Sequence, residues 1–323
     1  MMKKSTIAWL IVAASLVLLG AIIFGGVIMA VKFDFSKLNT TKFETNTHTV
    51  SDSFDSIAID TDTADITFLP SEDESCKVVC NELENINHSV EVIDGKLTIK
   101  CVDTRKWFEY IGINFGKTTV TVYLPQSEYK SISIDESTGD VYIPSNFKFE
   151  SIDVTVSTGD IACYSSTSGK IKLKASTGDI KLENISAGSI ELSVSTGRVS
   201  ISSVVCDGDI KLTATTGDTT LTNITCANLT SGAGTGKLIM NNVIASGNFS
   251  IERDTGDVRF EMCDASEITI VTDTGDVKGT LLSDKIFIAN TDTGRKDIPE
   301  TTTGGKCKIT TDTGDIKISI VED

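Results

Sequence analysis

Short runs of alternating apolar and polar residues fill the chain from about residue 54 onward. The segment 178–196 is typical: Ile180 and Leu182 alternate with polar residues, and Ile190 and Leu192 do so again after a turn-like stretch. A period of two is that of a β-strand with one buried face. The pattern predicts two short strands per segment, separated by turn residues, and no helix between them.

The dipeptide Thr-Gly divides this region into equal units. Its glycines follow one another at intervals of 19 or 20 residues: Gly139, Gly159, Gly178, Gly197, Gly217, Gly236, Gly256, Gly275, Gly294 and Gly314. A unit of this length cannot bury one face of two strands alone, so neighbouring units must stack. We therefore predict an all-β fold, a β-solenoid in which each unit is one coil about 4.8 Å from the next. An antiparallel β-sandwich or meander is the alternative, but the constant spacing favours the solenoid.

The chain divides into five parts. We predict a cytoplasmic tail over 1–6, a transmembrane anchor over 7–31, a stalk over 32–53, an irregular β entry region over 54–130 that caps the stack, and solenoid repeats over 131–323. The far end stops at the strand-like "IKISIVED". In the entry region, "TDTAD" (61–65) resembles a coil corner with Ala64 in the position of the glycine.

The anchor is the one long apolar segment. Residues 7–31 carry no charge, and 25 residues of helix at about 1.5 Å each span the roughly 30 Å hydrocarbon core. A cleaved signal peptide has a shorter apolar region followed by small residues. Lys3 and Lys4 favour an amino terminus inside the cell. We therefore expect a single-pass protein of the cell membrane with its C-terminal part outside the cytoplasm.

The charge of the chain restricts its partners. The net charge is −16, and without the two charges of Lys3 and Lys4 the remainder carries −18. Nucleic-acid binding requires a basic surface, so this class of function is excluded. An acidic, self-repelling surface is consistent with cations or basic groups as partners.

Several stretches together resemble a known bacterial family. They are "FDSIAIDTDTADITFLPSEDE", "DGKLTIK", "VTVYLPQSEYKSISIDESTGDVYI" and the serial "STGD" that follows. Over about 50–323 the chain is similar to the "putative adhesin" family, a domain of unknown function built of β-strand repeats. The resemblance implies a membrane-anchored or exported envelope protein, in some members linked to cell-envelope stress. It brings no catalytic residues.

Four corners read Asp-Thr-Gly, at 254–256, 273–275, 292–294 and 312–314, which is also the catalytic loop of aspartic proteases. Such a protease needs two carboxylates that share a proton. Four copies in register with six similar corners describe a repeat instead. Acids before and after the glycine could hold a hard cation such as Ca²⁺; this candidate row is Asp254, Asp257, Asp273, Asp276, Asp312 and Asp315. A solvated structural corner without any cofactor is the favoured alternative.

Other motifs carry weaker chemistry. "SGAGTGKL" (231–238) is one residue short of a phosphate-binding loop, and its Gly236 is a corner glycine. Most cysteines, among them Cys76, Cys80, Cys101, Cys163 and Cys263, alternate with aliphatic residues and are expected on the inner face.

Cys206 and Cys226 occupy equivalent positions of adjacent coils, which suits either a disulfide or two unpaired thiols, the latter being the default. His48 and His88 are isolated in sequence, so neither a histidine metal cluster nor a Ser-His-Asp triad is predicted. The segment "RKWFEYIGINF" (105–115) interrupts the alternation. It is either an exposed ligand or membrane patch around Trp107, or a cap over the first coils.

These features predict a membrane-anchored β-repeat protein without enzymatic activity, an adhesin or scaffold of the bacterial envelope. Its partner is an envelope protein or a glycan. Two alternatives stay open: an accessory or sensor protein of the envelope stress response, and a carbohydrate-active β-helix enzyme. The latter is disfavoured because such enzymes usually need an acid–base cluster and sugar-stacking aromatic residues.

Overall fold

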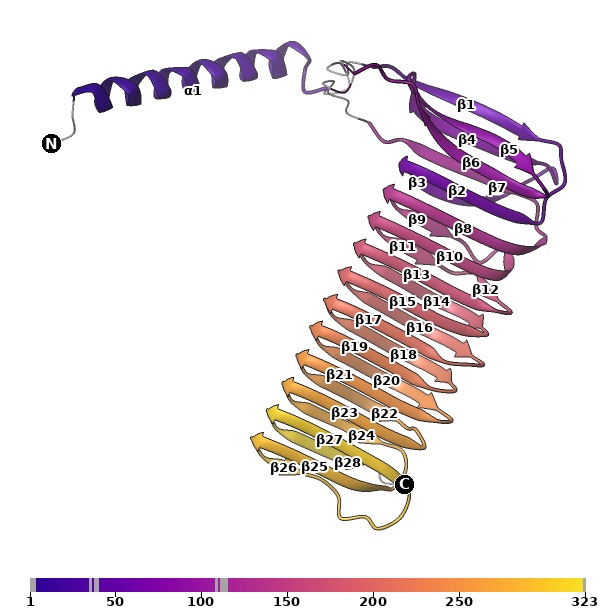
Figure 1. Cartoon of the computed structure of the whole chain (residues 1–323), viewed down its shortest axis with the longest axis vertical. Coiled ribbons are helices and arrows are strands. Elements are labelled where there is room, and N and C mark those ends of the chain that lie inside the picture. The colour runs from indigo at the N-terminus through magenta and orange to yellow at the C-terminus, as the bar shows by residue number, and fades with distance from the viewer. Residues whose placement is uncertain (1–3, 35–36, 38–40, 108–109, 111–115, 322–323) are drawn as a thin grey trace.

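The fold consists of one exposed helix and a long stack of strands (Figure 1). The computed structural model describes residues 4–34, 37, 41–107, 110 and 116–321. Helix α1 (Lys4–Ala30) contains an apolar segment, Trp9–Ala30, that is long enough to cross a membrane. None of this segment is buried against the rest of the described chain. The helix therefore takes no part in the core of the protein.

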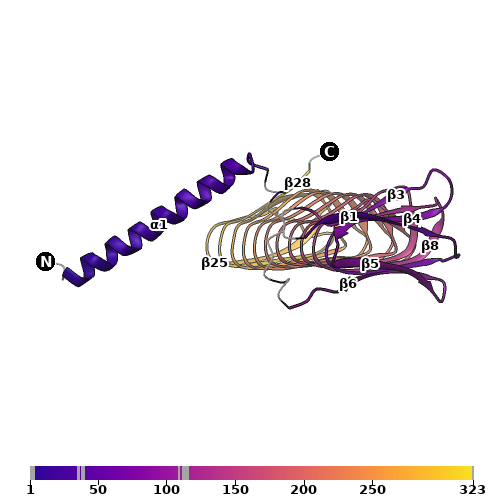
Figure 2. The same ribbon diagram turned by 90° about the horizontal axis from the view of Figure 1, so that it is seen from above.

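The strands form a β-solenoid with two parallel sheets facing each other across a narrow interior, and seen from above the coils form a flattened tube (Figure 2). The predicted all-β solenoid is confirmed. The strands that lead into the Thr-Gly corners form one sheet: β8 (Glu128–Thr138), β10 (Lys148–Thr158), β12 (Ser166–Thr167), β13 (Lys170–Thr177), β15 (Ser189–Thr196), β17 (Ile210–Thr216), β19 (Leu229–Thr235), β21 (Asn248–Thr255), β23 (Glu267–Thr274), β25 (Lys285–Thr293) and β27 (Gly305–Thr313).

The strands that follow the corners form the other sheet. They are β9 (Val141–Ile143), β11 (Ile161–Cys163), β14 (Ile180–Ala187), β16 (Val199–Cys206), β18 (Thr219–Cys226), β20 (Leu238–Ala245), β22 (Val258–Cys263), β24 (Val277–Leu281), β26 (Lys296–Asp297) and β28 (Ile316–Ile320).

Parallel pairing in register builds the core. Ile171, Ile190 and Ile210 are successive partners in the first sheet, and all three are fully buried. The second sheet changes its alternation after Leu182, so that Ile185 also faces inward. Asn184 lies between them with φ of 56°, in the left-handed region that asparagine tolerates better than most residues. Ser203, Asn223, Asn242 and Met262 repeat this conformation in the following coils.

Glycine is needed at the Thr-Gly corners because the corners stack in backbone contact. Gly178 has φ of +141°, and a Cβ added to it would lie 1.9 Å from the carbonyl oxygen of Gly159. Gly139 stacks in the same way on Ala64, whose backbone forms the first corner, between β2 (Ser56–Thr63) and β3 (Asp65–Pro70). Ala64 therefore does occupy the corner position expected from "TDTAD".

A cap of mixed topology covers the start of the solenoid. β4 (Cys76–Leu83) pairs antiparallel with both β1 (Phe43–Val50) and β7 (Thr119–Leu124), and β5 (Ile86–Ile93) pairs antiparallel with β6 (Lys96–Asp103). β6 and β7 then pair parallel with β2 and β3 of the first coil. Residues 43–50 thus belong to the cap, although sequence analysis placed them in a stalk over 32–53. Their Thr-rich strand lies at a sheet edge and is at most half-buried on one side, so it lacks a strong apolar pattern.

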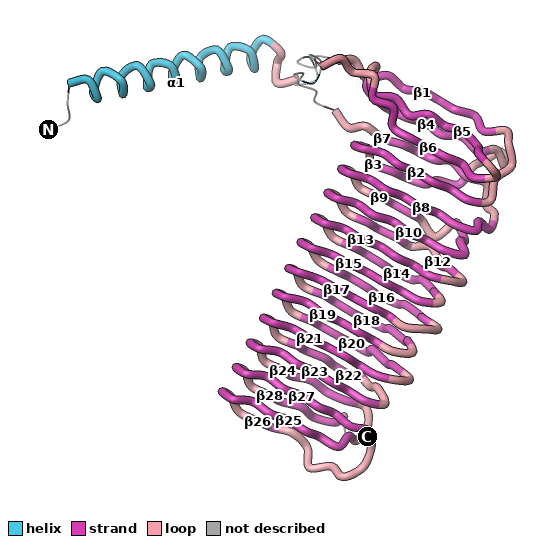
Figure 3. The backbone as a smooth tube through the Cα atoms, in the orientation of Figure 1, coloured by secondary structure: helices cyan, strands magenta, loops and turns pink. Residues whose placement is uncertain are grey.

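The far end of the rod does not follow the order of the chain. β27 lies between β23 and β25, and β28 lies between β24 and β26, so the last coil in sequence is the second-last in space. The connection from β26 to β27 crosses this end (Figure 3). The expectation that the solenoid ends at "IKISIVED" is therefore wrong, because β25 and β26 form the terminal coil.

The residue two positions after the corner glycine explains why the last two coils exchange places in the stack. Ile316 and Ile318 are buried after the corner at Gly314, whereas exposed Lys296 stands at the position equivalent to Ile316. The coil 305–320 can be covered on both sides, while the coil with Lys296 is suited to an open edge. Charged residues at a sheet edge also discourage further strand pairing.

The order of the last coils can be checked by cysteine cross-linking. Thr274 is the direct partner of Thr313, at a spacing of about 4.8 Å, whereas Thr293 lies one strand further away, at about 9.6 Å. Disulfides need Cα atoms within about 7 Å. We expect Thr274→Cys with Thr313→Cys to cross-link under mild oxidation, and Thr274→Cys with Thr293→Cys not to do so, as measured by mass mapping. The reverse result would restore the sequential order; the native chain controls for its own eight thiols.

Candidate functional site

Where an aspartate follows the corner glycine, its carboxylate binds the next coil. The backbone N–H of Asp160 donates to Asp140 Oδ1 at 2.9 Å, and that of Asp179 donates to Asp160 Oδ1 at 2.7 Å. The same bond recurs from Lys237 to Asp218 at 2.9 Å. Hydrogen bonds to an ionised acceptor are about twice as strong as neutral ones. We call this row of bonds along the rod the carboxylate ladder.

Each run of the carboxylate ladder ends at a base, which has no carboxylate to accept the next bond. The three runs are Asp65–Asp140–Asp160–Asp179–Arg198, Asp218–Lys237 and Asp257–Asp276–Asp315–Arg295. In sequence Arg295 interrupts the last run, but the exchanged coil order places it at the end. The backbone N–H of Arg295 is the main reason why the pKa of Asp315 is below its usual value.

Half of the candidate cation row belongs to this ladder. Asp257 and Asp276 also form ion pairs, at 3.0 Å with Arg259 and at 2.5 Å with Lys278. Asp315 likewise pairs with Arg295 at 3.3 Å. Lysine and arginine side chains therefore compete with any cation at these three carboxylates.

The other half of the row, Asp254, Asp273 and Asp312, is exposed to solvent before the corner. The structure stacks these Asp-Thr-Gly tripeptides in a single row rather than in two facing lobes, which is not the arrangement of an aspartic protease. Ca²⁺ binding by this row stays a prediction.

The phosphate-loop-like segment has a structural explanation. Arg253 is fully buried, and its guanidinium donates to the carbonyl oxygen of Ser231 at 2.9 Å and to its hydroxyl at 2.8 Å. Burial lowers the pKa of Arg253 to about 10. Ser231 stands where the adjacent coils carry Leu212 and Ile251, so this small residue leaves space and supplies acceptors. The pair was not predicted from the sequence; its signal there is a serine in a column of aliphatic residues.

The cysteines behave as core residues. Cys76, Cys80, Cys163 and Cys263 are buried as predicted, while Cys101 is partly exposed. Cys206 and Cys226 lie in adjacent coils as free thiols, and the Cys206 sulfur lies 3.7 Å from the carbonyl oxygen of Asp209. A disulfide between them stays a prediction.

Two sequence interpretations change in the entry cap. His88 is not isolated, because its Nδ1 lies 2.6 Å from Glu82 Oε2 inside the cap. In the interrupted segment 105–115, Trp107 is 78% exposed, which favours the exposed patch over the cap. Residues 108–109 and 111–115 of that segment lie outside the described part of the chain.

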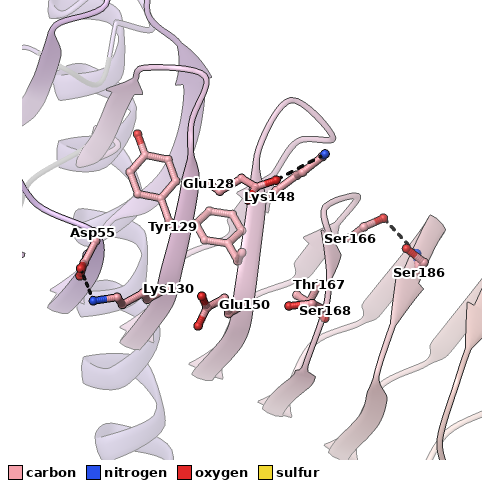
Figure 4. A pocket seen from close by; sticks show the side chains of 11 residues that line it. Asp55, Glu128, Tyr129, Lys130, Lys148, Glu150, Ser166, Thr167, Ser168 and Ser186 are labelled. Carbon is pink, nitrogen blue, oxygen red and sulfur yellow. Dashed lines mark hydrogen bonds and ion pairs between the residues drawn. The ribbon is translucent and has the colours of Figure 1, made fainter.

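A groove with a volume of about 470 Å³ lies on the first sheet, where β8 and β10 begin (Figure 4). Charged pairs line it: Asp55 lies 2.5 Å from Lys130, and Glu128 lies 3.6 Å from Lys148. The ring of Tyr129 is buried at its base. This groove therefore offers charges and hydroxyls rather than a stacking surface.

A second groove, of about 450 Å³, lies on the opposite sheet over β11, β14 and β16. Ala162 and Lys181 are among its lining residues, and Tyr142 is the strand partner of Ala162. Tyr142 is 42% exposed, and its ring centroid lies 5.6 Å from that of Tyr164. Lys181 Nζ lies 5.5 Å from the centre of the Tyr164 ring. We call this surface the tyrosine face; it combines exposed Tyr142 and partly buried Tyr164 with an adjacent groove of apolar and charged residues.

Comparison with known proteins agrees with this fold. The family model described as Toastrack DUF4097 matches residues 54–218 and 206–323. A crystal structure from Parabacteroides distasonis, described as a "putative adhesin", has a TM-score of 0.52 at 16% identity, covering 75% of this chain and 98% of its own. The resemblance inferred from the sequence motifs is thereby confirmed.

Two further structures described as "putative adhesin" match less closely. The one from Bacteroides fragilis has a TM-score of 0.38 at 17% identity, with 88% and 99% of the two chains covered. The one from Parabacteroides merdae has a TM-score of 0.31 at 14% identity, with 88% and 98% covered. A comparison with curated proteins gives no match.

The carboxylate ladder predicts different effects for two substitutions at one position. Asp160→Ala removes the acceptor for the Asp179 N–H and should lower the free energy of unfolding by about 1–2 kcal/mol. Asp160→Asn keeps the acceptor oxygen and removes repulsion between stacked carboxylates, so its stability should equal or exceed that of the native chain. Urea denaturation of the full chain in detergent measures both. Equal destabilisation by the two substitutions would contradict the ladder.

Proposed function

Because the chain belongs to the Toastrack DUF4097 family, we propose that it is a membrane-anchored rod that displays a binding surface outside the cytoplasm and has no catalytic activity of its own. It acts as an adhesin or scaffold of the bacterial cell envelope, with an envelope protein or glycan as partner.

The observation that carries this proposal is the exposure of α1. An apolar segment of 22 residues with no packing partner in the described chain is stable only in an apolar environment, and a bilayer provides it. The helix precedes the entry cap, so the rod extends away from the membrane with its exchanged coils at the far end. Its acidic surface is repelled by anionic lipid headgroups, which keeps the rod off the bilayer.

The tyrosine face is the surface that we assign to the partner. Tyrosine supplies a large, rigid contact area with a polar hydroxyl, and it is enriched in interfaces for that reason. The tyrosine pair also presents aromatic faces on which sugar rings can stack. The groove at Ala162 and Lys181 lies directly beside them and adds charged side chains of both signs, with Lys181 paired to Glu183 at 2.7 Å.

The orientation can be tested by labelling an introduced cysteine. Val205 is 55% exposed on the rod, while the native thiols are buried or, in Cys101, partly exposed. In cells stripped of outer layers but with an intact inner membrane, we expect a membrane-impermeant maleimide to label Val205→Cys as fully as after lysis. The native chain gives the background. Labelling only after lysis would place the rod in the cytoplasm and refute the proposal.

The binding surface can be tested by removing its rings. We expect the double substitution Tyr142→Ala and Tyr164→Ala to weaken binding of the detergent-solubilised full chain to isolated envelope fractions by at least about tenfold, since aromatic anchors typically contribute about 2 kcal/mol or more. Val205→Ala, which shortens an exposed side chain elsewhere on the same sheet, is the matched control. Sedimentation with the fractions measures binding; equal binding by all variants would rule out this face.

A further inference from the structure

Three side chains that commonly bind metals meet inside the entry cap. Cys80 and Glu82 are inward-facing residues of β4, and His88 follows on β5 after the turn between these strands. One ligand atom from each of the three residues lies within 4.8 Å of those of the other two. All three residues are buried, with exposures of 0%, 0% and 3%. The antiparallel hairpin of β4 and β5 brings them together.

The polar atoms of this cluster are only partly satisfied. Glu82 Oε2 accepts the backbone N–H of His88 at 2.7 Å and lies 2.6 Å from its Nδ1, and Glu82 Oε1 accepts from Asn46 at 2.7 Å. His88 Nε2 is buried and has no hydrogen-bond partner among the described residues. Such orphaned atoms are rare in folded proteins, and a bound ion can satisfy them. A structural Glu–His pair accounts for the Glu82 bonds but for neither Nε2 nor the adjacent thiol.

The same interior contains a second imidazole with the same property. His48 on β1 is opposite Val78, the next inward residue to Cys80 along β4. Its Nε2 is also buried without a partner in the described chain. The cap therefore encloses two imidazole nitrogens, His48 Nε2 and His88 Nε2, that have no hydrogen-bond partner among the described residues.

We propose that Cys80, Glu82 and His88 form a binding site for a Zn²⁺-like transition-metal ion. A thiolate, an imidazole and a carboxylate are the ligands that Zn²⁺ selects, whereas Ca²⁺ and Mg²⁺ require oxygen ligands. A tetrahedral ion with bonds of about 2.0–2.3 Å holds its ligand atoms about 3.2–3.8 Å apart. This spacing falls inside the 4.8 Å cluster, so the three side chains can reach it with small rotations.

The proposed ion takes the thiolate of Cys80, one carboxylate oxygen of Glu82 and one imidazole nitrogen of His88, and the thiol proton passes to solvent. Metal affinity should therefore rise with pH.

The ion would join the two sheets of the cap. β4 belongs to the sheet of β1 and β7, while β5 belongs to the sheet of β6. Outside the hairpin turn, where Leu83 pairs with Ile86, these two strands lie in opposite walls of the cap. A metal bridge from Cys80 and Glu82 to His88 would therefore hold the walls together at the end of the solenoid, where no further coil covers the core.

The experiment uses the full chain in detergent after treatment with a chelator. We expect it to bind one equivalent of Zn²⁺ with a dissociation constant below about 1 µM, and to raise its melting temperature by about 5 °C when saturated. Co²⁺ serves as a spectroscopic probe and should give a thiolate charge-transfer band and the visible absorption of a tetrahedral site. This readout needs no substitution, so it does not depend on the folding of any variant.

Matched variants locate the site. Cys80→Ala should abolish the charge-transfer band and weaken Zn²⁺ binding at least about 100-fold, and Glu82→Gln should weaken it at least about tenfold. Cys76→Ala, at another buried inward position of β4, should leave both properties unchanged. Absence of stoichiometric binding by the native chain would overturn the proposal and leave a purely structural Glu–His pair. Equal binding by the Cys80→Ala variant would place the metal elsewhere and also overturn it.

Discussion

Backbone contact between successive corners is the constraint on which the rest of the solenoid depends. A Cβ on Gly159 would lie 2.0 Å from the carbonyl oxygen of Gly139, and the same close approach recurs at each Thr-Gly corner. No side chain fits at these stacked corners, so every coil after the first, whose corner is Ala64, must turn at a glycine that stacks directly on the neighbouring corner. Register is then fixed along both sheets, because a slip of one residue would move every apolar side chain to the outside. Stacking in register also places equivalent side chains in rows, which explains both the aliphatic interior and the carboxylate ladder.

Rows of equivalent residues are favourable for aliphatic side chains and costly for charges. Unit charges about 4.8 Å apart repel each other by about 0.9 kcal/mol even in water. The ladder reduces this cost because each carboxylate accepts a backbone N–H from the next coil, and because a base follows one, three or four acids. In the interior, the buried charge of Arg253 also needs hydrogen-bond partners, because it has no contact with water. Its charge is tolerated because Ser231, in the adjacent coil, replaces an aliphatic residue and supplies two acceptors.

The sequence predicts the repeated part of this protein well and its ends poorly, for a physical reason. In a repeat the same sequence pattern occurs many times, so the corner glycines, the strand alternation and even the Ala64 corner can be predicted from the sequence. The strands of the entry cap obey no repeat, and the last two coils follow the repeat but exchange their order in space. The edge strand β1 has only weak alternation, and the exchanged position of β27 and β28 depends on which coil tolerates an open edge, a choice marked only by Lys296. The contact between Glu82 and His88 arises from a hairpin in the non-repeating cap, where sequence spacing gives no indication of the partner.

The two ends therefore differ chemically from the middle of the rod, because a stack of identical coils would leave an uncovered coil at each end. An uncovered coil exposes both its interior and a row of unpaired backbone groups, and such an edge invites association with another chain. At the far end the outermost coil has Lys296 in contact with solvent, where the two neighbouring coils have buried Ile316 and Val277. At the near end it turns to antiparallel strands, and Cys80, Glu82, His88 and His48 lie in that cap. Between the two ends, the outward-facing positions of the rod can vary without cost to the fold. The tyrosine face and the charged groove both lie on its first coils.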